Sequence, residues 1–309
     1  MQDVNFILTK VCNAKCSYCN VWNSGDTIAK PVDINLINSI LDTLPNYFGR
    51  VNAILNGGEV GLVPNIQDVV FSLAMHDRVK RISIYSNGTI RHRGLLPSTI
   101  NYKPIQIYEH AFVDLIGEDT IQYFSYKIIN FDLLNPRARK ENVTPIVVVT
   151  PNFLKFSSDS FIEKLSKSGV QYKMFAPKVR SDEEIDIKQY YNFFKHASDM
   201  RYDLAGDKDP IYLAYKNTLH NLKAGRCSVF CKTLLHNLYY DLSSDVPYIG
   251  QCTMDLSLWD NKMVFNVPDH HSLLEKLRLA PNKFCKYCFS GIPTQDNVIS
   301  KWIGMEKNS

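Results

Sequence analysis

Three cysteines near the start of the sequence have the spacing of metal ligands. Cys12, Cys16 and Cys19 are arranged as C-x3-C-x2-C, directly after the apolar, strand-like run Val4 to Leu8. Closely spaced cysteine thiolates on one loop can converge on a single iron–sulfur cluster. Three ligands would leave one iron of a four-iron cubane without a protein ligand, and a substrate could bind there. The alternatives are a zinc knuckle and a redox pair of cysteines, but structural zinc prefers four ligands, and no fourth Cys or His lies nearby.

A second group of cysteines lies near the other end of the sequence. It has the spacing Cys227-x3-Cys231-x20-Cys252-x32-Cys285-x2-Cys288, and no cysteine lies between residues 20 and 226. Two separate groups are more typical of two metal centres than of a disulfide framework. Residues 238–250, within the x20 spacer, have the pattern of a β-hairpin with a Ser-Ser-Asp turn. Four of these thiolates would also suffice for a zinc site, which stays an alternative.

With Tyr18 before its last cysteine, the first triad resembles the signature of the radical S-adenosylmethionine (radical SAM) superfamily. The resemblance implies a 4Fe–4S cluster on Cys12, Cys16 and Cys19 whose open iron binds SAM. It implies that electron transfer then cleaves SAM to methionine and a 5′-deoxyadenosyl radical. It also implies an external electron donor of the flavodoxin or ferredoxin type.

Two loops after predicted strands resemble further motifs of this superfamily. Gly57–Glu59 resembles its Gly-Gly-Glu motif, which holds the amino group of SAM, and Ser86–Gly88 resembles the loop that contacts the SAM ribose or carboxylate. Both stretches also suit ordinary turns, which stay an alternative. The resemblance places the Tyr18 backbone against the adenine. The expected SAM-binding residues are therefore Tyr18, Gly57, Gly58, Glu59, Ser86 and Asn87.

The second cysteine group resembles a twitch domain, the shortened form of the SPASM domain of radical SAM enzymes. The resemblance implies one auxiliary 4Fe–4S cluster, with Cys231, Cys252, Cys285 and Cys288 as the expected ligands. Three interpretations of Cys227 remain open: a small buried hydrophobic residue, the ligand in place of Cys231, or a speculative catalytic donor of a hydrogen atom to a substrate radical.

Strand and helix patterns alternate along the first 180 residues, which predicts a parallel sheet built from βαβ units. The chemistry-bearing loops follow predicted strands, so they should meet at the carboxyl edge of this sheet. We expect a partial (β/α)6 TIM-like barrel over 1–180, a helical bridge over 181–224 and a hairpin-plus-helix iron–sulfur domain over 225–309. Asp269-His270-His271 precedes an amphipathic pattern, so we expect it to begin a helix rather than to bind a metal. Strands are expected at 4–10, 51–55, 81–85, 144–150 and 170–175. Residues 105–108 and 127–131 also have strand patterns, and one of the two is expected to supply the sixth strand of the sheet. Helices are expected after Asp33 and at about 66–73, 159–168, 183–198 and 208–224.

Composition excludes several classes of protein. The chain has 309 residues, 45% of them hydrophobic and 21% charged, which is ordinary for a globular protein. A net charge of +4 is too mild for a nucleic-acid binder. The sequence has no secretory signal and no apolar run long enough for a bilayer. We therefore expect a cytoplasmic protein without a membrane or nucleic-acid partner.

The resemblance implies a radical SAM oxidoreductase or maturase that abstracts a hydrogen atom from a substrate C–H bond. The 17 Tyr and 16 Phe residues could line a broad cleft, which favours a peptide substrate and its epimerisation, crosslinking or oxidation. Only three residues precede the first strand, so no leader-binding domain is visible, which favours oxidation of a small hydroxylated metabolite such as an aminocyclitol. The rival of another class is a non-catalytic iron–sulfur or zinc protein.

Overall fold

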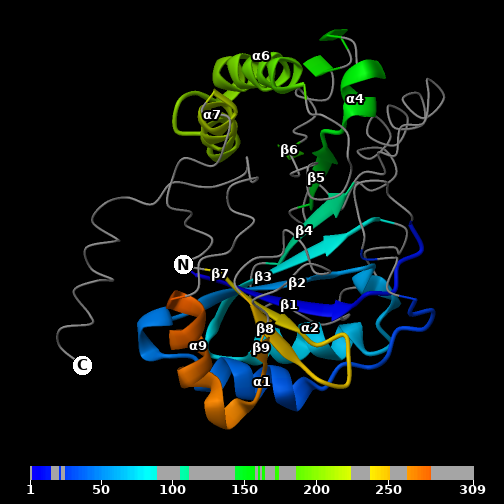
Figure 1. Cartoon of the computed structure of the whole chain (residues 1–309), viewed down its shortest axis with the longest axis vertical. Helices are drawn as coiled ribbons and strands as arrows, with labels where there is room; N and C mark the ends of the chain where they lie inside the picture. The colour runs from blue at the N-terminus through cyan, green and yellow to red at the C-terminus, as the bar shows by residue number, and fades with distance from the viewer. Residues whose placement is uncertain are drawn as a thin grey trace.

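The computed structural model describes most of the predicted strands and helices (Figure 1). Cys12 lies within the described ranges, whereas the other cysteines, Tyr18 and the strand expected at 127–131 lie outside them. The described residues are 2–14, 21, 25–88, 105–110, 143–156, 159–160, 162–163, 171–173, 186–223, 237–250 and 263–279.

The described strands form one sheet with the order β6-β5-β4-β3-β2-β1-β7-β8-β9. Strands β1 to β6 pair in parallel with their neighbours, which confirms the predicted parallel α/β class. Parallel pairing places the carboxyl ends of β1, β2 and β3 at the same edge of the sheet. The strands are β1 Asp3–Thr9, β2 Val51–Gly57, β3 Val79–Ser86, β4 Ile105–His110, β5 Val143–Val148, β6 Gln171–Lys173, β7 Asn237–Asp241, β8 Tyr248–Gly250 and β9 Met263–Val264.

Most helices lie where the sequence predicts them. Asp33 caps the first helix as expected, because its side chain accepts hydrogen bonds from the N–H groups of Asn35 and Leu36. None of the helices in the described ranges has the length and apolarity needed to cross a bilayer. The helices are α1 Ile34–Thr43, α2 Ile66–Met75, α4 Pro151–Phe156, α6 Ile187–Ala205, α7 Pro210–Lys223 and α9 His270–Leu279, with short 3-10 turns η2 Asn46–Phe48, η3 Val60–Leu62 and η7 Val267–Asp269.

The region after β5 differs from the prediction. The sequence pattern predicts a strand that extends to Thr150, but β5 ends at Val148 and α4 begins at Pro151. The Thr150 hydroxyl accepts a hydrogen bond from the N–H of Phe153 at 3.1 Å, so it caps the new helix. Proline at a first helical position behind a threonine cap favours a helix start. The β-branched run before Thr150 masks this signal in the sequence.

The helices and the sheet enclose two apolar cores. The first lies among β1 to β4, α1, α2 and α9, where alternate strand residues such as Val4, Phe6 and Leu8 are buried. The second is aromatic and lies among β5, β6, α4, α6 and α7, where the rings of Tyr172 and Phe193 meet edge to face at 5.0 Å. Figure 1 shows the two groups of helices at opposite ends of the sheet. Because successive residues of a strand point to opposite faces, the residues between the core residues, such as Asn5 and Asn56, face the other side of the sheet.

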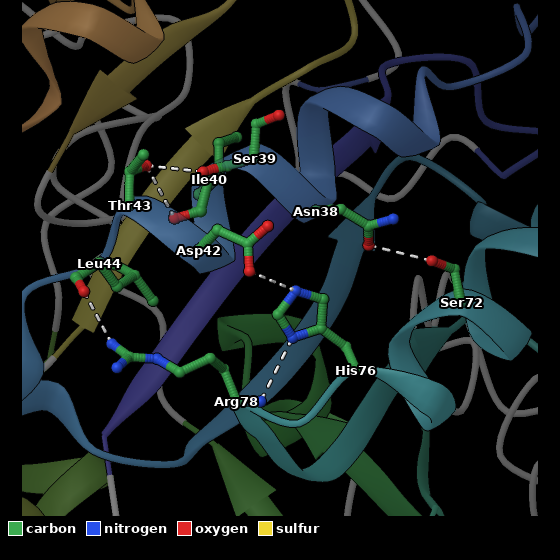
Figure 2. A network of polar contacts seen from close by, with 9 residues as sticks. All are labelled: Asn38, Ser39, Ile40, Asp42, Thr43, Leu44, Ser72, His76 and Arg78. Atoms are coloured by element: carbon green, nitrogen blue, oxygen red, sulfur yellow. Dashed lines mark hydrogen bonds and ion pairs between the residues drawn. The ribbon is translucent and has the colours of Figure 1, made fainter.

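A polar network fixes α1 and α2 near the start of β3 (Figure 2). The Nε2 atom of His76 lies 3.3 Å from Asp42 Oδ1, and the Arg78 guanidinium donates to the carbonyl of Leu44 at 2.8 Å. Arg78 directly precedes β3, so this network lies at the amino edge of the sheet. Side chains at that edge of a barrel serve stability rather than chemistry.

The C-terminal hairpin continues the main sheet. Strand β7 pairs in parallel with β1, with Ile7 opposite Asp241, and β8 returns antiparallel to β7. This confirms the predicted hairpin, and the N–H of Ser243 donates to Asp241 Oδ1 at 3.1 Å in its turn. The sheet is thus continuous across the boundary expected at residue 225, while the division into three domains stays a prediction.

His270 joins the hairpin to the first helix through a directional chain of hydrogen bonds. The Thr43 hydroxyl donates to the carbonyl of Ser39 at 2.6 Å, so its oxygen accepts from His270 Nδ1 at 2.7 Å. The hydroxyl of Tyr240 then donates to His270 Nε2 at 2.6 Å. Burial raises the pKa of Tyr240 well above its ordinary value, which keeps this donor protonated. Both ring nitrogens are thus engaged within the fold, in agreement with a structural role.

The buried imidazole predicts a loss of stability in mild acid. Burial lowers the pKa of His270 from 6.5 to about 4, so the unfolded chain binds a proton that the folded chain does not. Stability is therefore full above pH 6.5 and falls as the pH drops toward 4. We expect a loss of about 2 kcal/mol from this group between pH 7 and pH 5, measured by urea unfolding.

The neighbouring His271 offers a matched control, because its side chain is 73% exposed. His271→Gln should keep the pH dependence, whereas His270→Gln should flatten it. Equal slopes in the two variants would contradict this role of His270.

Candidate active site

The chain reaches Cys12 through a short segment that follows β1. The pairing of β1 with β2 shifts register between Ile7 and Thr9, which marks the end of the regular strand. The Thr9 hydroxyl then accepts a hydrogen bond from the N–H of Val11 at 3.0 Å. These contacts give the segment a defined path into the cysteine loop.

Two glycines at the end of β2 pack directly on this segment. The N–H of Gly58 donates to Thr9 O at 2.7 Å, and the N–H of Glu59 donates to Val11 O at 2.9 Å. A Cβ on Gly58 would lie 2.1 Å from Val11 O, and a Cβ on Gly57, which has φ +136°, would lie 2.3 Å from Thr9 O. The close approach that requires glycine is therefore to the backbone before Cys12. Their contact with SAM stays a prediction.

Glu59 is fully buried and joins the ends of β2 and β3. One carboxylate oxygen accepts from the N–H of Gly61 at 2.9 Å, and the other accepts from the N–H of Asn87 at 2.7 Å. The Ser86 hydroxyl donates to both oxygens, at 3.0 and 3.2 Å. The resemblance implies that this carboxylate binds the SAM amino group, which stays a prediction, and in the structure it organises the neighbouring loop.

Asn87 and Cys12 come together from different strand ends. The side-chain amide of Asn87 lies 3.6 Å from Cys12 Sγ and donates to Asn13 Oδ1 at 2.8 Å. The N–H of Ala14 also donates to Cys12 Sγ, at 3.5 Å. Two N–H donors on a half-buried sulfur stabilise the negative charge of a metal-bound thiolate. The surroundings of Cys12 thus fit an iron–sulfur ligand.

The other expected ligands fall outside the described ranges. This applies to Cys16 and Cys19, to Tyr18 and to the whole second cysteine group. Within the described residues, no three His, Cys, Asp or Glu side chains converge as metal ligands. The two proposed clusters therefore stay predictions, supported at the first site by the environment of Cys12. The cysteines of the second group are Cys227, Cys231, Cys252, Cys285 and Cys288.

Asn56 supplies a hydrogen-bond acceptor beside these loops. Asn5 Nδ2 donates to the carbonyl of Leu238 at 3.3 Å, and Asn56 Nδ2 donates to Asn5 Oδ1 at 3.3 Å. A carbonyl oxygen only accepts, so Leu238 fixes the orientation of both amides. Asn56 Oδ1 is left buried, without a hydrogen-bond partner among the described residues. Such an acceptor suits an N–H or O–H group of a bound ligand.

Lys10 and Asp241 form an ion pair that sequence reasoning missed. Lys10 Nζ lies 3.1 Å from Asp241 Oδ2, and the Asp241 side chain is only 1% exposed. Lys10 follows β1 and Asp241 ends β7, so the pair lies at the same edge of the sheet as Cys12. One sequence feature could have indicated this pair: Asp241 is a carboxylate at the end of the otherwise apolar and aromatic run that begins at Leu238.

Comparisons with known proteins reveal similarity at the level of structure. No family model matches the sequence, and no curated protein matches it. SuiB of Streptococcus suis, solved with its precursor peptide SuiA, aligns over 94% of this chain and 71% of its own, with 13% identity and a TM-score of 0.57. The protein anSMEcpe, solved with AdoMet and the Cp18Cys peptide, aligns over 93% of this chain and 85% of its own, with 15% identity and a TM-score of 0.57.

Proposed function

We propose that this chain, which has the fold of the radical SAM enzymes SuiB and anSMEcpe, is itself a radical SAM enzyme. Cys12, Cys16 and Cys19 would hold a 4Fe–4S cluster, and SAM would bind beside Gly57–Glu59 and Ser86–Asn87. Such a cluster, once reduced by the external donor, would supply the one electron that cleaves SAM to methionine and a 5′-deoxyadenosyl radical, and this radical would abstract a substrate hydrogen atom. The observation that carries this proposal is the meeting of Cys12, Glu59 and Asn87 at one edge of the sheet.

Hydrogen bonds within the chain hold the residues of the proposed cluster and SAM sites in place. Gly58 and Glu59 hold the backbone on both sides of Lys10 through hydrogen bonds to Thr9 and Val11. The Glu59 carboxylate fixes the N–H of Asn87, whose amide then donates to the sulfur of Cys12. Rigid support of this kind places ligands without a reorganisation cost during the reaction.

A peptide is the substrate that the comparisons favour. SuiB was solved with a precursor peptide and anSMEcpe with the Cp18Cys peptide. We therefore propose a peptide maturase, with epimerisation, crosslinking or oxidation as its outcome. The buried acceptor Asn56 Oδ1 suits an amide N–H of such a substrate. A small hydroxylated metabolite stays the alternative substrate, and an external one-electron donor is part of the proposal.

We also propose one auxiliary 4Fe–4S cluster in the C-terminal segment. The hairpin β7–β8 separates Cys231 from Cys252, which supports the resemblance to a twitch domain, and α9 ends six residues before Cys285. Cys252, Cys285, Cys288 and either Cys231 or Cys227 are the proposed ligands.

The proposal predicts the result of replacing Cys12 with alanine. Anaerobically reconstituted protein should hold about eight irons per chain and form 5′-deoxyadenosine from SAM after reduction. Cys12→Ala should retain about four irons and lose deoxyadenosine formation, since the radical is made at the first cluster. Chromatography of the quenched reaction measures this product.

Cys252→Ala serves as the matched control, because it should lose the other irons and still form deoxyadenosine. Deoxyadenosine formation by Cys12→Ala at the wild-type rate would refute the assignment of the first triad.

A further inference from the structure

The ion pair between Lys10 and Asp241 connects the cysteine loop to the C-terminal hairpin. We propose that Lys10 and Asp241 shift the reduction potential of the cluster held by the first triad in opposite directions, with Asp241 offsetting the charge of Lys10. The inference rests on the proposed function, since it requires a cluster on Cys12. Lys10 and Asp241 are thus positioning residues, because their charges change how readily the cluster accepts an electron from the external donor.

The position of Lys10 is fixed by its two neighbours. Thr9 O accepts from the N–H of Gly58 at 2.7 Å, and Val11 O accepts from the N–H of Glu59 at 2.9 Å. Lys10 lies between these two anchored residues and only two positions before Cys12. The backbone of Lys10 is therefore held close to the cluster ligand, and its side chain, 21% exposed, places Nζ beside Asp241.

Asp241 is fixed equally well from the side of the hairpin. It lies opposite Ile7 in the register of β7 and β1, and the next residue, Leu242, donates to Ile7 O at 2.8 Å. Its Oδ1 atom accepts from the N–H of Ser243 at 3.1 Å and also from the Ser243 hydroxyl. The other carboxylate oxygen, Oδ2, lies 3.1 Å from Lys10 Nζ.

The two charges should act on the cluster in opposite directions. Reduction adds one electron from the external donor and thus one negative charge to the cluster, with no bond formed or broken. A nearby positive charge stabilises the reduced state and raises the potential, and a nearby negative charge lowers it. Because Asp241 is almost fully buried, water screens its charge weakly.

The hairpin offers a control ion pair of the same type. Lys30 Nζ lies 2.8 Å from Asp245 Oδ1, four residues after Asp241, but these side chains are 69% and 86% exposed. Exposed charges are screened by water and salt. Asp245→Asn therefore removes the same charge from the same hairpin without a comparable effect on the cluster.

The test is a redox titration of the reconstituted full-length protein, in which electron paramagnetic resonance monitors the reduced cluster. The signal that changes on addition of SAM identifies the cluster on the first triad. Asp241→Asn should raise its midpoint potential and Lys10→Met should lower it. The double variant K10M/D241N should return close to the wild-type value, and Asp245→Asn should leave it unchanged.

Two results would overturn the inference. One is a potential in Asp241→Asn equal to that of Asp245→Asn. The other is a shift of Asp241→Asn and Lys10→Met in the same direction, because a disturbed loop rather than a charge produces that pattern. Failure of the proposed function itself is distinguishable, since the wild-type protein would then show no signal that responds to SAM.

Discussion

Replacing Gly58 with alanine is expected to abolish deoxyadenosine formation while leaving most of the fold intact. The added Cβ would lie 2.1 Å from Val11 O and 2.6 Å from Val11 C, so the backbone before Cys12 must move. Overpacking of this kind costs about 1–3 kcal/mol and here displaces a cluster ligand. Iron content and deoxyadenosine formation measure the loss at the site, and circular dichroism measures the retained fold.

Gly49→Ala is the matched control for this substitution. Nothing lies within 4 Å of the position of its added Cβ, so only the φ of +56° opposes alanine. Because φ +56° is combined with ψ −138°, a conformation that residues with a Cβ rarely adopt, we expect a loss of about 1–3 kcal/mol in stability and no loss of iron. If Gly58→Ala instead binds iron and cleaves SAM like Gly49→Ala, the packing argument fails.

The second large effect is expected at Glu59. Its carboxylate is fully buried and accepts hydrogen bonds from the N–H groups of Gly61 and Asn87 and from the Ser86 hydroxyl. Glu59→Ala leaves these donors unpaired and should cost about 3 kcal/mol or more, measured by urea unfolding. Iron binding should weaken as well, because Asn87 also contacts Cys12 Sγ.

An isosteric exchange sharpens this prediction. Because an N–H group faces each oxygen of Glu59, the amide of Glu59→Gln must point its NH2 at one of these donors. Glu59→Gln should therefore destabilise the protein although it preserves volume. Glu275→Gln is the control, since that side chain is 65% exposed. Equal stability of the two variants would show that the Glu59 bonds contribute little.

The location of the candidate site could be predicted from the sequence, whereas most contacts between its residues could not. Because parallel strands share a carboxyl edge, the motifs at Cys12, Gly57–Glu59 and Ser86–Gly88 could be placed together from their strand patterns alone. The partners of Glu59 could not be predicted, since they depend on how two loops meet in space. The Lys10–Asp241 pair was missed because its members are far apart in sequence and the parallel pairing of β7 with β1 has no local signal.

The same distinction holds for the fold. Periodicity and a capping residue predicted α1, since Asp33 and the buried Ile37, Ile40 and Leu41 act within one turn or two of each other. Helix α4 was missed where a strand-like run overlaps the local Thr150-Pro151 signal. The structural use of His270 depends on Thr43 and Tyr240, which come from distant elements, so its sequence neighbours could not reveal it.

The place of β1 between β2 and β7 has a consequence for synthesis of the chain. Asn5 and Leu238, which touch across the β1–β7 boundary, are 233 residues apart. Strand β1 therefore leaves the ribosome long before β7 has been synthesised, and the peptide groups along one edge of β1 remain unpaired during elongation. Protection of that edge by a chaperone should decide how much of the nascent polypeptide escapes aggregation.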